Sequence, residues 1–138
     1  MRIATRSILL AMPAAKIGLQ YYATGLQRFV ERIGPSATKR IFLTGENIQA
    51  DELLTMGYLA EILDSDMLEP RASEICEAIS NLAPNAVKMT KKAIDDLAGR
   101  NPDLGQIQSN HLASARSEEH LEAMKALREK RKPNFEGS

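Results

Sequence analysis

Apolar positions along the chain recur at helical spacing far more often than at strand spacing. The first predicted helix begins near Gly25, and its apolar stripe follows the i, i+3, i+4, i+7 pattern of one helix face. The residues of that stripe are Leu26, Phe29, Val30 and Ile33. Gly34-Pro35 ends this helix, because proline disfavours a helical conformation in the residue before it. A second short helix is expected from Ser36 through Ile41, stopping at Thr44-Gly45.

The same pattern predicts helices over most of the remaining chain. Further helices are expected over residues 51–56, 66–82, 84–97 and 104–130, with a turn at residues 99–103 and a break near Ser117. Gly57 suits a left-handed helix end, and Asp66 with Glu69 has the spacing of a capping box. The Ser117 hydroxyl, followed by two glutamates, suits a helix start.

Two short segments have the character of strands. The first is the apolar run from Ile8 to Met12, and the second is residues 58–63, which alternate weakly. Two isolated strands make a poor sheet, so the N-terminal strand is expected to lack a partner. The fold class predicted is mostly α with a few short strands.

The amino-acid composition limits the binding partners and the cellular compartment that can be expected. The 138 residues carry 18 basic and 18 acidic side chains, so the formal net charge is zero. The composition therefore gives no reason to expect nucleic acid or an anionic membrane as partner. The N-terminal twelve residues superficially resemble a targeting peptide, but the apolar run is too short to span a membrane, and a strand is favoured. The single cysteine, Cys76, fits a reducing cytoplasm, and its spacing predicts a packed helix position. His111 and His120 have no partners at ligand spacing, so no metal site is expected.

The segment from Met12 to Arg28 carries the most information about function. A strand, a proline, a loop with two glycines and a helix start follow one another, an order that commonly builds a ligand site. Glycines let a backbone approach a ligand closely, and a helix start offers unpaired N–H groups. Gly18 and Gly25 are therefore candidate residues of a substrate pocket, and Tyr22, which lies between them, is a further candidate.

This segment resembles the middle of the crotonase (enoyl-CoA hydratase/isomerase) superfamily, which typically reads Met-Pro-Glu-x-x-x-Gly-Leu here. Three further segments are similar to family motifs in order and spacing: Ile41 to Glu46 with Gly57-Tyr58-Leu59, Ala83 to Val87 with Lys91-Lys92, and Glu129 to Gly137. The resemblance implies the C-terminal half of the α/β crotonase spiral fold plus its C-terminal helical region. It assigns residues 1–83 to the spiral core and residues 84–138 to a helical oligomerisation region.

Family members act on acyl-CoA thioesters through an enolate-like transition state, with two backbone N–H groups binding the thioester oxygen. By the resemblance, both donors and the first of two hydratase glutamates precede the residue matching Met1. The second glutamate falls at Ala14, whose methyl group cannot transfer a proton, and the water-positioning glycine falls at Tyr22. Standard two-glutamate hydration is therefore not expected.

Tyr21 falls where methylmalonyl-CoA decarboxylase-like members carry a tyrosine, which makes it the candidate catalytic residue. Loss of carbon dioxide itself creates the enolate, so no added base is needed. The alternative is that Tyr21 and Tyr22 pack with their hydroxyls at a rim. The resemblance also assigns Lys130 to contact with coenzyme A and places an aromatic neighbour at Leu127. The alternative is that the basic residues between Lys125 and Lys132 are solvent-exposed at a helix end, where the helix dipole favours positive charge.

Together these residues predict a protein that binds or transforms acyl-CoA, with coenzyme A as part of the substrate and no separate cofactor or metal. Nucleic acid and membrane are not expected partners. A homo-oligomer, trimer or hexamer as in intact relatives, and a cytoplasmic location are expected. Whether the chain is an enzyme stays open: a decarboxylase-like enzyme, a non-catalytic remnant that associates with homologues, and a truncated or misassigned gene start are the alternatives.

Overall fold

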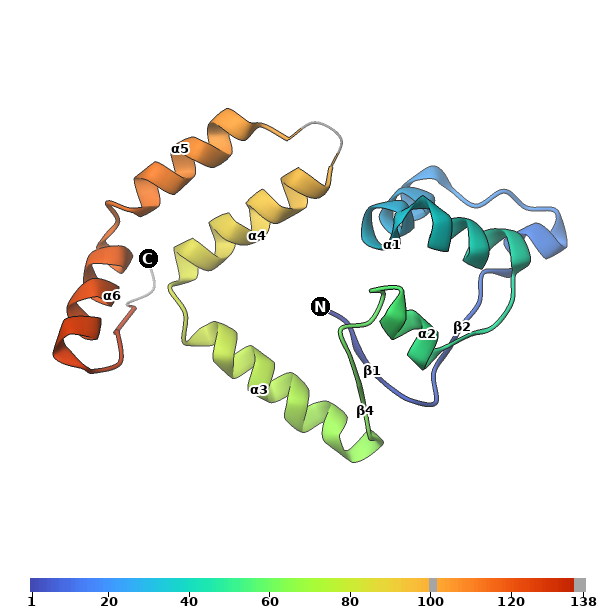
Figure 1. The fold of residues 1–138 in the computed structure, drawn as a ribbon, viewed down its shortest axis with the longest axis horizontal. Helices are drawn as coiled ribbons and strands as arrows, with labels where there is room; N and C mark the ends of the chain where they lie inside the picture. Colours follow the sequence, from blue (N-terminus) through green and yellow to red (C-terminus); the bar gives the residue numbers. More distant parts are fainter. Residues whose placement is uncertain (100–101, 136–138) are drawn as a thin grey trace. The chain divides into compact units, whose positions relative to one another are not determined.

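The computed structural model describes residues 1–99 and 102–135, which form two compact units (Figure 1). The first unit is Met1–Ser73 and the second is Glu74–Ser138. The division expected at residues 83 and 84 concerns family regions and stays a prediction. Part of the turn expected at 99–103, and residues 136–138 at the end of the C-terminal motif, lie outside the described residues.

Short strands alternate with helices in the first unit. In chain order the elements are β1 (Ile3–Thr5), β2 (Leu9–Leu10), η1 (Pro13–Ile17), α1 (Ala23–Thr44), β3 (Ile48–Gln49), α2 (Ala50–Thr55), β4 (Glu61–Leu63), η2 (Ser65–Met67) and α3 (Leu68–Ser80), which continues into the second unit. β1 pairs in parallel with β4, with Ala4 opposite Ile62. β2 pairs antiparallel with β3, with Leu10 opposite Ile48. The expectation of an unpartnered N-terminal strand is wrong, because each partner strand lies far along the chain.

The core of the first unit lies between these strand pairs, the second half of α1, and α2. Ile41, Ile48 and Leu53 are fully buried. The whole buried cluster is Ala4, Ile41, Phe42, Ile48, Ala50, Leu53 and Leu59. Burial of one large aliphatic or aromatic side chain contributes about 1.5–3 kcal/mol, so this cluster supplies much of the unit's stability.

A break in the backbone divides α1 at Gly34 and Pro35. Gly34 has φ 74° and ψ 168°, and Pro35 follows it. Glycine adopts positive φ without a Cβ clash, so the backbone changes direction here, and the Thr38 hydroxyl donates a 2.7 Å hydrogen bond to the Gly34 carbonyl. The break predicted from Gly34-Pro35 is confirmed.

Among its described residues, the second unit contains helices joined by loops and no strand. Its helices after α3 are α4 (Pro84–Ala98), α5 (Leu104–Ser114) and α6 (Glu118–Glu129). The Ser117 hydroxyl accepts a hydrogen bond from the His120 N–H at 3.2 Å, so the helix start predicted at Ser117 is confirmed. The Glu119 carboxylate on α6 accepts the N–H groups of Asn85 at 2.9 Å and Ala86 at 3.2 Å. A carboxylate from α6 thus caps the N-terminus of α4.

Three local predictions need correction. The strand expected from residue 58 begins only at Glu61, because the Tyr58 N–H donates to the Leu53 carbonyl and closes the end of α2. Asp66 does not cap α3, because the chain enters that helix through η2, of which Asp66 is a member. Cys76 is exposed rather than packed. The fold class is nevertheless confirmed: the chain is mostly α-helical, with a few short strands.

Candidate functional site

The loop that carries Ala14 is a tight 3₁₀ turn closed by glycine. η1 begins at Pro13 and ends at Gly18, which has φ 71°. The Gly18 N–H donates to the Ala15 carbonyl at 3.2 Å, and the Leu19 N–H donates to the Ala14 carbonyl at 3.0 Å. Gly18 therefore serves the turn directly, since its left-handed backbone favours glycine. Its role in a substrate pocket stays a prediction.

Tyr21 and Tyr22 stack on one another over Gly25. Their ring centroids are 4.5 Å apart with an angle of 30° between the ring planes. A Cβ atom on buried Gly25 would contact Tyr21 Cε1 and would lie 2.8 Å from Tyr22 Cζ. The missing side chain of Gly25 therefore leaves room for the two tyrosine rings. From the sequence, this glycine was attributed to the close approach of a ligand. The structure brings these three candidate residues together.

The tyrosine pair continues into a row of aromatic contacts across the first unit. Tyr21 meets Phe42 edge-on at 5.0 Å, and Phe42 meets Phe29 edge-on at 5.0 Å. Phe29 stacks on Tyr58 at 5.6 Å, and the Arg2 guanidinium lies 4.4 Å from the Tyr58 ring centre. Edge-on and offset-stacked pairs are the favoured aromatic geometries. We call Tyr21, Tyr22, Phe29, Phe42 and Tyr58 the aromatic row.

Tyr21 is held as a neutral phenol. A side-chain hydrogen bond with Tyr22, followed by burial, raises the pKa of Tyr21 above its usual value. A protonated phenol donates a hydrogen bond and cannot serve as a base at neutral pH. With only a methyl group at Ala14, this part of the loop offers a hydrogen-bond donor and no proton-accepting carboxylate.

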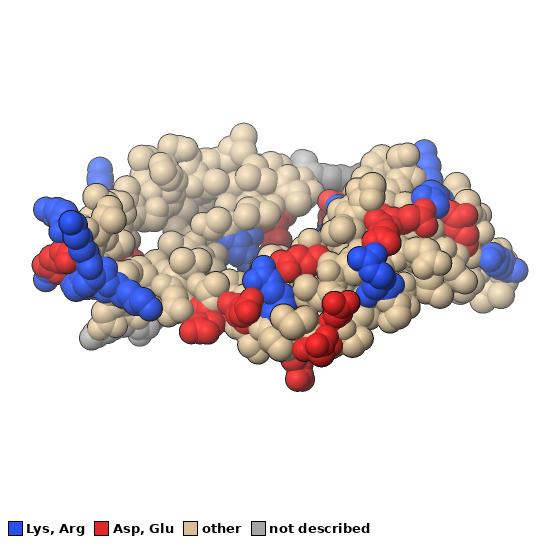
Figure 2. All heavy atoms as spheres, turned by 60° about the horizontal axis from the view of Figure 1, so that its bottom comes forward, with Lys and Arg blue, Asp and Glu red and all other residues tan. Residues whose placement is uncertain are grey.

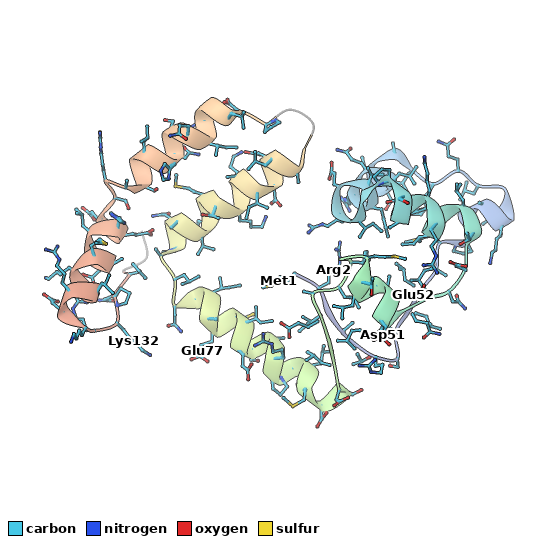
Figure 3. The ribbon with its side chains drawn as sticks, in the orientation of Figure 1. Met1, Arg2, Asp51, Glu52, Glu77 and Lys132 are labelled. Carbon is cyan, nitrogen blue, oxygen red and sulfur yellow. The ribbon has the colours of Figure 1, made fainter. Side chains whose placement is uncertain are left out.

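Three carboxylates of the first unit, Glu46, Asp51 and Glu52, are paired with arginines. Asp51 and Glu52 lie on α2 (Figure 3), where Asp51 binds Arg6 at 2.8 Å. Arg40 binds Glu52 and, at 2.7 Å, Glu46. The hydrogen bond from Arg40 lowers the pKa of Glu52. Each of these three carboxylates thus already forms an ion pair with an arginine of the first unit.

The two candidate residues for coenzyme A contact lie at the end of α6, in the second unit. Leu127 is 71% exposed. Lys130 follows the helix with φ 53°, a left-handed backbone. Figure 2 shows Lys and Arg side chains gathered at the α6 end of this unit. The cluster is formed by Lys125, Arg128, Lys130, Arg131 and Lys132.

Arg131 forms ion pairs with two glutamates of α6. Its guanidinium binds Glu122 through two contacts of 2.6 and 3.0 Å and binds Glu129 at 2.6 Å. Glu122 also accepts the Asn134 N–H at 2.8 Å. The Arg131 contact, together with that N–H, lowers the pKa of Glu122 to about 2. We call Arg131, Glu122, Glu129 and Asn134 the Arg131 cluster.

Sequence reasoning missed both the Arg131 cluster and the aromatic row. Glu122 and Arg131 are nine residues apart, a spacing that helical periodicity does not join. The Arg131 cluster borders a cavity of about 680 Å³, whose lining includes Glu119 and Phe135. Neither the cavity nor its lining was anticipated.

Neither a membrane-spanning helix nor a metal-binding group is found among the described residues. None of the helices in residues 1–99 and 102–135 combines the length and the apolar character needed to span a bilayer. Within the same residues, no three His, Cys, Asp or Glu side chains are grouped in a way that could hold a metal ion.

The sequence and the fold of the chain are similar to those of one family of known proteins. The model of the enoyl-CoA hydratase/isomerase family matches residues 1–138. A short-chain-enoyl-CoA hydratase of Clostridium acetobutylicum is 33% identical over 94 residues, which cover 68% of this chain and 36% of that protein. The methylmalonyl-CoA decarboxylase of Escherichia coli is 28% identical over 139 residues, covering 98% of this chain and 53% of the decarboxylase.

Solved structures give the same result. The crystal structure of an enoyl-CoA hydratase from Bacillus anthracis superposes with a TM-score of 0.88 at 29% identity, covering 100% of this chain and 54% of that one. Where nearly all of the chain is aligned, it spans about half of the length of its relative. A family match along its whole length and the shared fold together establish that the chain belongs to the enoyl-CoA hydratase/isomerase family.

Proposed function

We propose that the protein acts on acyl-CoA thioesters through enolate chemistry, and that its reaction is not two-glutamate hydration. The family match supports the substrate class. Ala14 carries the proposal about the reaction, because it stands at the position that the resemblance matches to a glutamate, and the two carboxylates of α2, Asp51 and Glu52, are paired with arginines. Coenzyme A enters as part of the substrate, with no separate cofactor.

Decarboxylation of a 2-carboxyacyl-CoA such as methylmalonyl-CoA is the enolate reaction that Tyr21 favours. The bond between the α-carbon and the carboxylate breaks, its electron pair stays on the α-carbon and delocalises into the thioester, and carbon dioxide leaves. A proton then adds to the α-carbon. The neutral Tyr21 phenol would orient the substrate carboxylate by donating a hydrogen bond, a role that requires no base.

Two parallel assays on the 138-residue chain separate these reactions. Loss of the conjugated-thioester absorbance of crotonyl-CoA measures hydration, and release of carbon dioxide from methylmalonyl-CoA measures decarboxylation. We expect the second to exceed the first. Hydration at a rate typical of enzymes, with kcat of roughly 1 to 10³ per second, would overturn the argument from Ala14.

Tyr21→Phe is the matched test of the phenol, because it removes the hydroxyl and keeps the ring. A hydrogen bond to a charged group contributes about 1.5–3 kcal/mol, so decarboxylation should fall about tenfold or more. Tyr58→Phe, which removes a hydroxyl from the Tyr58 ring stacked on Phe29, is the control and should retain most of the activity. Equal activities for wild type and Tyr21→Phe would assign Tyr21 to packing alone.

A second candidate function is non-catalytic assembly with full-length homologues or with further copies of the chain as a trimer or hexamer. Large apolar side chains exposed on the second unit favour it, among them Ile94 at 61% and Leu121 at 62% exposure. Size-exclusion chromatography of the chain alone, and mixed with a complete homologue, tests this function. An isolated monomer with measurable turnover would eliminate it.

A cytoplasmic location completes the proposal, supported by the single cysteine.

A further inference from the structure

Lys130 has a backbone conformation that its residue type does not favour. With φ 53°, it is the one non-glycine residue of positive φ among residues 1–99 and 102–135. Its N–H donates to the Leu127 carbonyl at 3.3 Å, and the Arg131 N–H donates to the Ala126 carbonyl at 3.1 Å. This is the Schellman arrangement of a helix end, in which glycine is the usual residue at the Lys130 position. A side chain kept at such a position points to a role for that side chain.

Glu122 and Glu129 of α6 are paired with Arg131 rather than with Lys130. Within the described part of the chain, no carboxylate forms an ion pair with Lys130. The neighbouring Arg131 binds both Glu122 and Glu129. Arginine is suited to this task, because its planar guanidinium presents several donors in a fixed geometry.

The same arginine fixes the backbone that follows Lys130. Arg131 Nη1 donates to the Lys132 carbonyl at 3.1 Å, and Glu122 accepts the Asn134 N–H at 2.8 Å. Lys130 is thus bounded by the hydrogen-bonded end of α6 on one side and by a fixed tail on the other. Figure 3 shows Lys132 beside this helix end. A group already fixed at its backbone loses less conformational freedom when a ligand binds.

We propose that Arg131 is a positioning residue for Lys130, holding Glu122 and Glu129 so that the lysine ammonium is free to bind a phosphate of coenzyme A. Without Arg131, the carboxylate of the adjacent Glu129 would compete with the phosphate for Lys130, and the tail after Lys130 would lose its anchor. This inference rests on the proposed function, since it requires that the chain binds acyl-CoA.

Two probes and a double-mutant cycle test the proposal on the full chain. Acetyl-CoA carries the phosphates, whereas S-acetylpantetheine has the same thioester arm without the nucleotide. Isothermal titration would compare wild type, Lys130→Gly, Arg131→Met and the double variant. Lys130→Gly should weaken acetyl-CoA binding about tenfold, leave S-acetylpantetheine unchanged, and raise the Tm because glycine suits the left-handed position. Arg131→Met should weaken acetyl-CoA binding severalfold and have no further effect in the Lys130→Gly background.

Arg128→Met is the matched control, because it removes one positive charge from the same helix end without touching the Arg131 cluster. Within residues 118–135, the Arg128 guanidinium contacts the Met124 carbonyl alone, at 3.4 Å. Arg131→Met should exceed Arg128→Met in its effect on acetyl-CoA. Equal losses of acetyl-CoA affinity in Arg131→Met and Arg128→Met would mean that Arg131 contributes only its positive charge. Additive losses of affinity in the Lys130→Gly, Arg131→Met double variant would show that Arg131 does not act through Lys130. Either result overturns the inference.

Failure of the proposed function is distinguishable from failure of this inference. If wild type binds neither probe, acyl-CoA binding by the chain is wrong and the inference falls with it. If wild type binds acetyl-CoA and the Lys130→Gly and Arg131→Met variants bind equally well, the inference alone is wrong. Should Arg131→Met unfold below the assay temperature, Arg131→Lys takes its place: it keeps the charge, loses the two-point contact with Glu122, and should still weaken acetyl-CoA binding.

Discussion

The two units place their candidate residues by different physical means. In the first unit, Tyr21 is held by ring contacts, with Phe42 on one side and Tyr22 on the other. In the second, Lys130 is bordered by ion pairs and backbone hydrogen bonds around Arg131. Ring contacts depend on volume and shape, whereas exposed ion pairs depend on pH and salt. Substitutions that change side-chain volume should therefore destabilise the first unit, and substitutions that change charge should destabilise the second.

Phe42→Ala should have the largest effect, because it removes the ring that joins Tyr21 to Phe29. Phe42 is 7% exposed, and truncation of a buried phenylalanine costs about 3–5 kcal/mol. Urea unfolding measures the loss. The adjacent Leu43→Ala, at a side chain 74% exposed, should change stability by less than about 0.5 kcal/mol. Equal losses at the two positions would mean that the aromatic row does not hold the first unit together.

Gly25→Ala should come next, because the new methyl group would overlap the rings of Tyr21 and Tyr22. Insertion of a methyl group into a filled space costs about 1–3 kcal/mol. Gly105→Ala is the control, since a Cβ there meets only the Asp103 Oδ1 atom at 3.4 Å, and alanine is the better helix former. Near-UV circular dichroism should change for Gly25→Ala and not for Gly105→Ala. An unchanged tyrosine signal in both variants would contradict the stacking over Gly25.

Glu119→Ala should have a smaller effect, confined to the second unit. It removes the carboxylate that accepts the Asn85 and Ala86 N–H groups at the start of α4. Loss of an N-terminal cap costs about 0.5–2 kcal/mol. Thermal unfolding by far-UV circular dichroism would detect it, with Glu118→Ala on the same turn as control. A larger loss for Glu118→Ala would reverse the assignment.

The smallest expected effect is a change in acid sensitivity. The pKa of Glu122 lies at about 2 in the folded chain, against an ordinary value of 4.5. A depressed pKa stabilises the fold above the unfolded value, and that contribution disappears as pH falls from about 4.5 to about 2. Glu122→Gln should flatten the helical signal of the chain across this window, while Glu118→Gln should not. An identical acid profile for wild type and Glu122→Gln would show that the Arg131 contact is absent in solution.

The sequence predicted the parts of this molecule that depend on neighbouring residues. Ser117 caps α6, and Gly34-Pro35 breaks α1, because a hydroxyl or a proline acts on the backbone within a few residues. Asp66 shows the limit of such reasoning. Its spacing matched a capping box, yet a 3₁₀ turn precedes the helix and includes Asp66.

The contacts that build the candidate sites join residues far apart in the chain. Tyr21 meets Phe42, and Glu119 meets Asn85, 34 residues away. No periodicity connects such pairs, since their contact follows from how whole helices pack. The family resemblance located Tyr21 and Lys130 as candidates, but it could not show that Gly25 admits two tyrosine rings or that Arg131 binds both glutamates.

The placement of the aromatic row makes the two units separately observable by optical spectroscopy. The chain has no tryptophan, and its three tyrosines, Tyr21, Tyr22 and Tyr58, all belong to the first unit. Intrinsic tyrosine fluorescence therefore reports on the first unit alone, while far-UV circular dichroism reports on the helices of both. A melt followed by the two signals will divide into separate transitions if the units unfold independently and will coincide if they unfold together. The native chain thus carries its own reporter for the first unit and needs no added label.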